Sequence, residues 1–124
     1  MSEVKSHRDL TVWQKSMALA AECYRLSALI PKVEQFRLTS QLLRAAASVP
    51  ANIAEGHVRG TRKDYAHFVA IARGSLAETE TFLELAVTVG LLTTEKAQLA
   101  MDLCREVGKM LGALHVRLRT PPDP

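Results

Sequence analysis

Basic side chains gather around one short segment of the sequence, and their chemistry is that of phosphate binding. Arg59, Arg62 and Lys63 flank Thr61, whose spacing to Asp64 is typical of a helix N-cap. The backbone N–H groups at a helix start are unpaired, and with cationic side chains beside them they form a site for anions such as phosphate. The helix dipole by itself favours acidic residues at this position, not basic ones. The segment therefore predicts contacts with the phosphate backbone of RNA or DNA. The alternative is a solvated surface whose charges pair between subunits or with the tail, for instance with Asp123.

The patterns of known catalytic sites are incomplete in this sequence. Di-iron bundles need two Glu-x-x-His pairs and two more carboxylates, whereas the chain offers Asp64-x-x-His67 once. Residues 56–63 combine glycines with basic residues but lack the Gly-x-x-x-x-Gly-Lys-Ser/Thr spacing of a phosphate loop. Gly74 and Ser75 follow no strand and have no base beside them, so they are not a nucleophile elbow. We expect no catalytic residues, no metal and no cofactor, and a small enzyme is the third alternative considered.

The composition bounds the class of protein. The chain has 124 residues, 48% of them apolar and 23% charged, and 16 basic and 13 acidic side chains give a net charge of +3. These values predict one soluble globular domain whose core is built mainly from Leu, Ala and Val. Cys23 and Cys104 lie far apart without a Cys-x-x-Cys spacing, which predicts two reduced, mostly buried thiols. Without a secretory signal or a run of about 20 apolar residues, we expect a cytoplasmic protein that does not enter a membrane.

Apolar residues recur every three or four positions in four segments, which is the period of an amphipathic helix. The stripes cover residues 10–28, 38–56, 65–86 and 99–114. Pro31 is expected to end the first helix and Pro50 to kink the second. The first helix is expected to be capped by Asp9 or by Thr11, which has capping-box spacing to Gln14. The other expected caps are Thr61 with Asp64, and Thr93 or Thr94, and Gly90 is expected to end the third helix.

Four helices of about 20–28 residues with short links predict an all-α fold, an antiparallel up-down-up-down four-helix bundle. Residues 1–124 then form a single domain, with an ordered core at 8–118 and a frayed tail at 119–124. In such a bundle the start of the first helix, the turn between the second and third, and the end of the fourth lie at one end. That end, the basic pole, is expected to collect Lys5, Arg8, Arg59, Arg62, Lys63, Arg117, Arg119 and the four histidines, His7, His57, His67 and His115. The opposite end is expected to collect Glu80, Glu84 and Glu95.

The second helix carries two further patterns. Polar residues follow one face of it: Gln41, Arg44, Ser48, Asn52, Glu55 and Arg59. We interpret this stripe as a hydrogen-bond network that includes Ser75 and Glu78, in preference to an active site. A weakly apolar row lies beside it: Leu43, Ala47, Pro50 and Ala54. This row is compatible with a contact between subunits or with packing inside the same bundle.

Three segments of the sequence resemble a known family. They are residues 9–15 (Asp-Leu-Thr-Val-Trp-Gln-Lys), residues 40–56, with Ser-Val-Pro-Ala-Asn-Ile-Ala-Glu-Gly at their end, and residues 72–78 (Ala-Arg-Gly-Ser-Leu-Ala-Glu). They resemble the four-helix-bundle proteins encoded within intervening sequences of bacterial large-subunit ribosomal RNA genes. The accessory variability proteins of diversity-generating retroelements are similar. The resemblance extends over residues 8–118, while Arg37 replaces a usual Gly and Leu43 a frequent Arg.

The resemblance implies a ring-like homopentamer and, from the retroelement branch, a basic surface for nucleic acid and for a reverse transcriptase. We therefore expect a non-enzymatic, self-assembling accessory or scaffold protein that binds the backbone of RNA or DNA. The alternative is a structural or protein-interaction adaptor without nucleic-acid binding, for example a partner of a reverse transcriptase. The expected phosphate contacts are Arg59, Arg62, Lys63, Arg117 and Arg119, with Arg44 and Arg73 as further candidates from the resemblance.

Overall fold

The structure, a computed structural model, describes residues 3–121, where all regular secondary structure is helical. Its four α-helices are α1 (Thr11–Ser27), α2 (Ser40–Val58), α3 (Arg62–Thr88) and α4 (Thr94–Arg119). Residues 3–121 contain no strand, so the prediction of an all-helical chain with four helices is confirmed. With 17 and 19 residues, α1 and α2 are shorter than the minimum of about 20 that the apolar stripes suggested.

The missing length lies in irregular helical turns around α1 and α2. A 3-10 turn, η1 (His7–Asp9), precedes α1, and another, η2 (Lys32–Glu34), follows it. A π-helical segment, η3 (Gln35–Thr39), then leads into α2, and Arg37 in it has φ −113° and ψ −106°, outside the helical region. α2 itself runs without a break through Pro50. The interruption on this side of the molecule is therefore at Arg37, before the helix, and not at the proline within it.

Three of the predicted helix ends are found where the local sequence placed them. The Thr61 hydroxyl accepts a hydrogen bond from the Asp64 backbone N–H at 3.1 Å, and the Thr93 hydroxyl accepts one from Lys96 at 3.2 Å. Gly90 has φ +82° directly after the end of α3, the left-handed conformation that glycine adopts readily. These caps need only short-range spacing, which explains why the sequence was sufficient to predict them.

The cap predicted for the first helix is wrong. The N-cap residue of α1 is Leu10, which makes no side-chain cap hydrogen bond. The capping box lies one turn earlier, at η1. There the Ser6 hydroxyl accepts a hydrogen bond from the helix backbone, and the Asp9 carboxylate accepts one from the Ser6 backbone N–H. The side-chain amide of Gln14, expected to complete the box with Thr11, instead donates to the Arg8 carbonyl at 2.8 Å.

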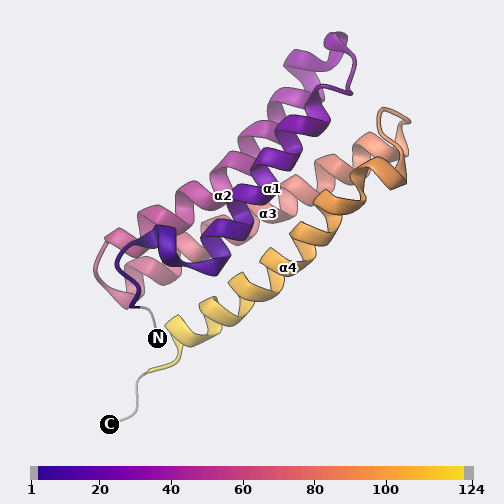
Figure 1. Cartoon of the computed structure of the whole chain (residues 1–124). Coiled ribbons are helices and arrows are strands. Elements are labelled where there is room, and N and C mark those ends of the chain that lie inside the picture. The colour runs from indigo at the N-terminus through magenta and orange to yellow at the C-terminus, as the bar shows by residue number, and fades with distance from the viewer. Residues whose placement is uncertain (1–2, 122–124) are drawn as a thin grey trace.

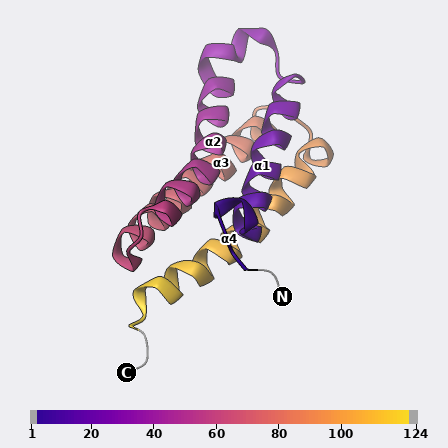
Figure 2. The ribbon, with the colours of Figure 1, turned by 60° about the vertical axis from the view of Figure 1, so that its left-hand side comes forward.

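Each helix packs mainly against two of the other three. α1 contacts α2 and α4, and α3 contacts the same two helices. Figures 1 and 2 both show α2 and α3 side by side. In Figure 1 the α1–α2 and α3–α4 connections lie at one end, and the α2–α3 turn lies at the other end with the beginning and end of the described chain. The segments that carry the predicted basic pole therefore come from one end of the molecule.

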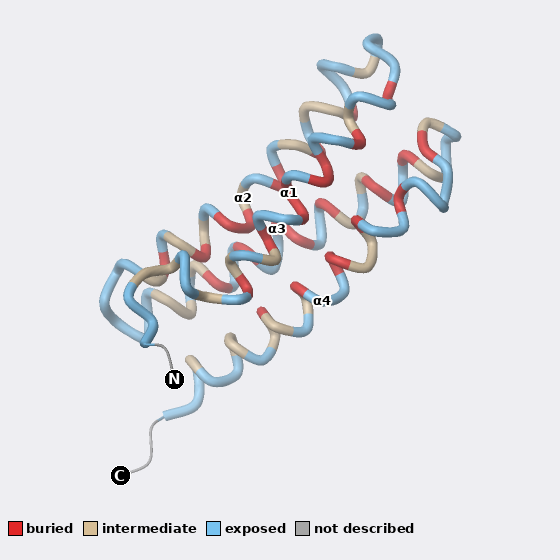
Figure 3. Tube along the Cα trace, in the orientation of Figure 1, coloured by how far each residue is buried: buried red, intermediate tan, exposed pale blue. Residues whose placement is uncertain are grey.

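Buried residues lie on the sides of the helices that face one another (Figure 3). The largest fully buried side chains are mostly aliphatic: Leu19, Leu26, Leu42, Ile53, Leu83, Leu111, Val49, Val69 and Val107. Cys23 and Cys104 are buried and free, and burial raises the pKa of each thiol to about 12. Both thiols are thus protonated at neutral pH, which makes them poor nucleophiles.

The C-terminal boundary differs from the prediction. Arg119 is the last residue of α4, and the Thr120 backbone N–H still donates to the Val116 carbonyl at 3.0 Å. Residues 122–124 of the predicted frayed tail lie outside the described residues. Within the described chain, none of the helices combines the length and the apolar character needed to cross a membrane.

Gly56 permits the closest contact between α2 and α3. A Cβ atom at this position would lie 2.8 Å from the Phe68 Cβ and 3.0 Å from the Tyr65 Cδ1. Contacts this short require the helices to move apart, because the neighbouring atoms belong to the start of a side chain and to a ring. Only glycine therefore fits at this crossing point without displacement.

We predict that Gly56→Ala lowers the free energy of unfolding by about 1–3 kcal/mol, the usual cost of overpacking a tight contact. Gly112→Ala is the matched control, because a Cβ at Gly112 meets nothing within 4 Å and alanine favours the helix by about 1 kcal/mol. Urea unfolding followed by circular dichroism measures both. Equal effects of the two substitutions would contradict the packing argument.

Candidate nucleic-acid interface

Arg62 joins the start of α3 to the end of α4. Its guanidinium donates hydrogen bonds to the backbone carbonyls of Arg117 and Thr120, the latter at 2.8 Å. These residues are separated by more than 50 positions in the sequence, and the contact closes one end of the molecule. The structure thus brings together two of the basic segments that the sequence placed at a common pole.

The acceptors of Arg62 explain why a cation is tolerated at the start of a helix. The last carbonyls of α4 have no partner within the helix and carry the negative end of its dipole. Thr120 satisfies the Val116 carbonyl, through its hydroxyl at 2.8 Å, and Arg62 satisfies that of Arg117. Arg62 therefore caps α4 from the neighbouring helix. Its principal contact is with the protein, so it positions the pole and has fewer donors left for a phosphate.

The start of α1 belongs to the same end of the molecule. Leu10 and Thr11 line a cavity of about 410 Å³ together with Tyr65 of α3 and Arg117 of α4. Burial raises the pKa of the Tyr65 hydroxyl, and the charge of Arg117 partly offsets this. Three segments from distant parts of the sequence therefore surround one cavity at the basic pole.

The remaining predicted contacts fall into two groups. Arg59 lies 3.4 Å from the Glu55 carboxylate, and its guanidinium carbon is 4.9 Å from the centre of the Phe68 ring. In contrast, the side chains of Lys63, Arg117 and Arg119 are exposed and form no ion pair within 4.0 Å of another described residue. Among the predicted phosphate contacts, these three are therefore free to meet a polyanion.

Arg73 lies further along α3 and contacts a histidine. Its Nη1 is 3.1 Å from the Nδ1 of His115 on α4. Because a guanidinium is always protonated, Nδ1 acts as the acceptor, and the imidazole is neutral in this arrangement. Desolvation, followed by the charges of Arg73 and Arg119, lowers the pKa of His115. At neutral pH this pair therefore contributes one positive charge, that of the arginine.

The other three histidines each contact an aromatic ring edge to face. His57 lies against Tyr65 with ring centres 5.7 Å apart, and His67 against Phe68 at 5.2 Å. His7 meets Trp13 at 5.2 Å. The part of the chain that the structure describes holds no group of three His, Cys, Asp or Glu side chains able to bind a metal. The sequence missed Tyr65 and Phe68 as supports of the pole, although both lie on the first apolar turns of α3.

Arg44 is separated from the basic pole. It lies 15 residues before Arg59 on the same helix, about 22 Å along its axis. It borders a notch between α2 and α3 together with Glu78. In the polar stripe around it, Ser48 and Ser75 are hydrogen-bonded at 2.8 Å, and Asn52 donates to the Ser48 hydroxyl at 2.9 Å. The predicted hydrogen-bond network is therefore present in its central part.

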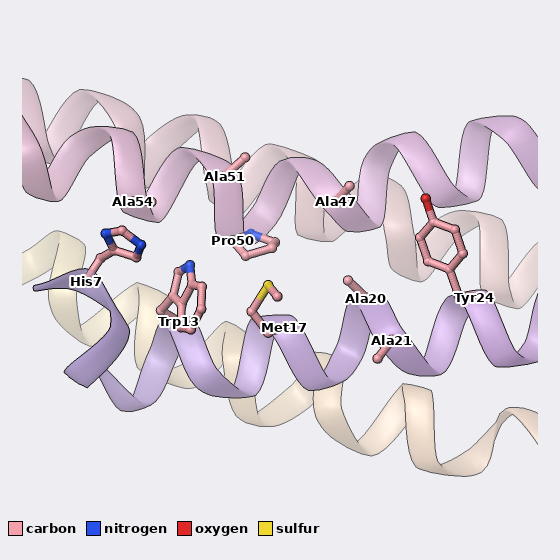
Figure 4. Close-up of a pocket in the computed structure, with 10 residues that line it drawn as sticks. All are labelled: His7, Trp13, Met17, Ala20, Ala21, Tyr24, Ala47, Pro50, Ala51 and Ala54. Atoms are coloured by element: carbon pink, nitrogen blue, oxygen red, sulfur yellow. The ribbon is translucent and has the colours of Figure 1, made fainter.

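An apolar groove runs between α1 and α2 and has a volume of about 510 Å³. Figure 4 shows the side chains that line it: His7, Trp13, Met17, Ala20, Ala21, Tyr24, Ala47, Pro50, Ala51 and Ala54. Tyr24 and Met17 are 58% and 45% exposed. Three members of the predicted weakly apolar row, Ala47, Pro50 and Ala54, line the groove, whereas Leu43 packs against the core. The row is thus only partly covered by this chain.

Comparison with known proteins gives the family. The model of the 23S rRNA-intervening sequence protein family matches residues 8–113. The chain belongs to this family. The resemblance seen in the three sequence segments is confirmed to that extent. No curated protein matches the chain.

A solved structure supports the assignment of the chain to this family. It is the crystal structure of a protein of unknown function from the S23 ribosomal protein family of Bacteroides thetaiotaomicron. The two chains are 27% identical, with a TM-score of 0.78, and the match covers 85% of this chain and 98% of the other. This member of the 23S rRNA-intervening sequence protein family therefore shares its fold with a relative over nearly the whole length of that relative.

We predict that Arg62→Gln loosens the last turn of α4, because the carbonyls of Arg117 and Thr120 lose a charged donor. The free energy of unfolding should fall by about 1 kcal/mol, and amide hydrogen exchange should accelerate at residues 117–120. Lys63→Gln, which removes the adjacent cation without touching α4, is the control. Unchanged exchange in Arg62→Gln would show that this contact does not hold the end of the helix.

Proposed function

We propose that this chain is a non-enzymatic, antiparallel four-helix bundle that self-assembles and binds the phosphate backbone of RNA or DNA through its basic pole. The observation that carries the proposal is the contact of Arg62 with the end of α4. It joins the start of α3, which carries Lys63, to the end of α4, which carries Arg117 and Arg119. The protein would then act as an accessory or scaffold for nucleic acid.

The chemistry of the pole favours backbone contacts over base recognition. Lysine and arginine beside a helix N-terminus bind phosphate oxygens and carry no direct information on sequence. The aromatic rings nearby, Tyr65 and Phe68, are half-buried and in contact with His57, His67 and Arg59, so they do not offer free faces for stacking bases. Binding is therefore expected to tolerate different sequences and to weaken as salt increases.

The apolar groove supports self-assembly. Its α1 side extends from Trp13 to Tyr24, about 16 Å of helix. Alanines on both walls let another helix approach closely, and Trp13, Met17 and Tyr24 supply apolar area to bury. The family resemblance implies a ring of five copies. Such a ring would repeat the basic pole five times and extend the positive field over a larger surface.

Fluorescence anisotropy with a labelled single-stranded RNA and a duplex DNA, across a salt series, tests the nucleic-acid part. We expect a Kd of about 1–10 μM at low salt and a steep loss of affinity by physiological salt. Lys63→Gln and Arg119→Gln should each reduce the slope of log K against log salt by about one. Lys96→Gln, in the first turn of α4 at the opposite end, is the matched control and should leave the slope unchanged. Absence of binding at low salt by the assembled protein would refute the proposal.

Light scattering coupled to size exclusion tests the assembly. Ala51 is exposed in the protomer and lines the groove, so Ala51→Glu should leave the fold intact and shift the protein toward the monomer. Ala77→Glu, at an exposed position of α3 outside the groove, is the control and should retain the wild-type mass. An unchanged mass for Ala51→Glu would place the subunit contact elsewhere.

The groove also favours the second candidate function, an adaptor that binds a helical protein. The resemblance to retroelement accessory proteins implies a reverse transcriptase as such a partner. An assembled protein that fails to bind RNA or DNA at any salt concentration, and whose groove variants lose a polymerase partner, would support the adaptor. The salt series therefore separates the two functions before any partner is known.

A further inference from the structure

A small polar notch lies between α2 and α3, outside the basic pole. Its volume is about 230 Å³. The hydrogen-bonded hydroxyls of Ser48 and Ser75 lie at one level of the two helices. Arg44 and Glu78 follow one turn along, on opposite walls, and Phe82 borders the notch a further turn away.

The two serines leave one hydroxyl proton uncommitted. The pair has two O–H protons, and a single hydrogen bond of 2.8 Å joins the oxygens, so only one proton lies between them. The side-chain amide of Asn52 donates to the Ser48 carbonyl at 2.8 Å and to the Ser48 hydroxyl oxygen at 2.9 Å. Asn52 is thus a donor in both bonds and does not accept a serine proton. No other described group accepts from either hydroxyl within 3.5 Å. Ser75 is only 6% exposed, so the hydroxyl pair lies at the floor of the notch. Whichever serine accepts the shared proton keeps its own O–H as a donor suited to an anionic oxygen.

The charges on the two walls face each other without pairing. Gly56 packs against Phe68, and Ser48 bonds to Ser75, so residue numbers rise along α2 as they fall along α3. This register places Arg44 opposite Glu78. Neither forms an ion pair within 4.0 Å of any residue in the range 3–121. A guanidinium and a carboxylate thus stand on opposite sides of a small opening whose floor is a hydroxyl donor.

We propose that this notch binds a small zwitterion of the α-amino acid class. The ligand carboxylate accepts hydrogen bonds from Arg44 and from the spare serine hydroxyl, and its ammonium donates to Glu78. An aliphatic side chain packs on Phe82 and Ala45. A volume of about 230 Å³ equals that of roughly seven or eight water molecules at about 30 Å³ each, which suits a ligand the size of valine.

The same charges argue against a polyanion in this notch. Glu78 would repel a phosphate placed on Arg44, whereas a zwitterion satisfies both walls at once. The site needs neither the basic pole nor the assembly, so it is independent of the proposed function. It also assigns a binding role to Ser48, Ser75 and Glu78, to which the nucleic-acid proposal gives none.

An NMR titration of the full-length, ¹⁵N-labelled protein with L-valine tests the proposal in the absence of nucleic acid. A ligand of this size with two exposed charged partners is expected to bind with a Kd of about 1 mM. Amide shifts should saturate and be largest at Ser48, Ser75 and Glu78. Isobutyrate, which lacks the ammonium, and isobutylamine, which lacks the carboxylate, should each bind at least about tenfold more weakly.

Variants separate this site from general charge effects. Arg44→Gln, Glu78→Gln and Ser75→Ala should each weaken valine binding, while Lys96→Gln and Glu95→Gln, on α4, should not. Thermal unfolding of each variant without ligand checks that the fold is retained. Isobutyrate binding as well as valine would overturn the zwitterion in favour of a plain anion site. The absence of saturable shifts up to about 20 mM valine, well above the expected Kd, would overturn the site itself.

Discussion

The close approach of α2 to α3 at Gly56 is the constraint on which both candidate sites depend. With no side chain at this position, the helix backbone meets the Phe68 Cβ and the Tyr65 ring directly. This contact sets the register of the two helices, so Ser48 lies against Ser75 and Arg44 lies opposite Glu78. The contact lies next to the short α2–α3 turn, and Arg62 in the first turn of α3 reaches the end of α4. A shift of one turn between these helices would dismantle the notch and release the end of α4 together.

The basic pole illustrates how local preference and tertiary contact compete. A cation in the first turn of a helix is unfavourable with respect to the helix dipole by about 0.3–1 kcal/mol. Arg62 offsets this cost by placing its charge at the carboxyl end of α4, where the dipole has the opposite sign and carbonyls lack partners. An arginine at the start of α3 therefore satisfies the end of α4. The predicted phosphate contacts without such a role are Lys63, Arg117 and Arg119.

The sequence was sufficient for features that depend on short-range spacing and insufficient for those that depend on packing. The caps at Thr61 and Thr93 and the end at Gly90 follow from patterns within four residues, and the structure contains them. The π-helical segment Gln35–Thr39 has no such signature, because its backbone is set by how the α1–α2 connection packs. Arg62 was expected to contact phosphate, but in the structure its acceptors are backbone carbonyls of another helix. A side-chain pattern in the sequence does not predict such acceptors. The Ser48–Ser75 bond was expected as part of a network. That Arg44 and Glu78 face each other without pairing could be seen only once the position of α3 relative to α2 was known.

In the proposed function, assembly and polyanion binding would be coupled by the number of free cations on one protomer. Each neutralised phosphate contributes about 0.9 to the slope of log K against log salt, so Lys63, Arg117 and Arg119 account for a slope of about −2.7 and weak binding. A nucleic acid that spans neighbouring poles of an assembly would contact several such sets of cations. Its binding would therefore stabilise the assembly, and assembly would in turn raise the affinity for the nucleic acid. The coupling has an asymmetry that comes from the residues involved. The groove is lined by apolar side chains and His7, without lysine, arginine or acidic residues, so removal of a cation at the pole would leave the proposed subunit contact unchanged. Disruption of the groove, in contrast, would reduce both the proposed assembly and the apparent affinity for nucleic acid, because each isolated protomer would retain only its own cations.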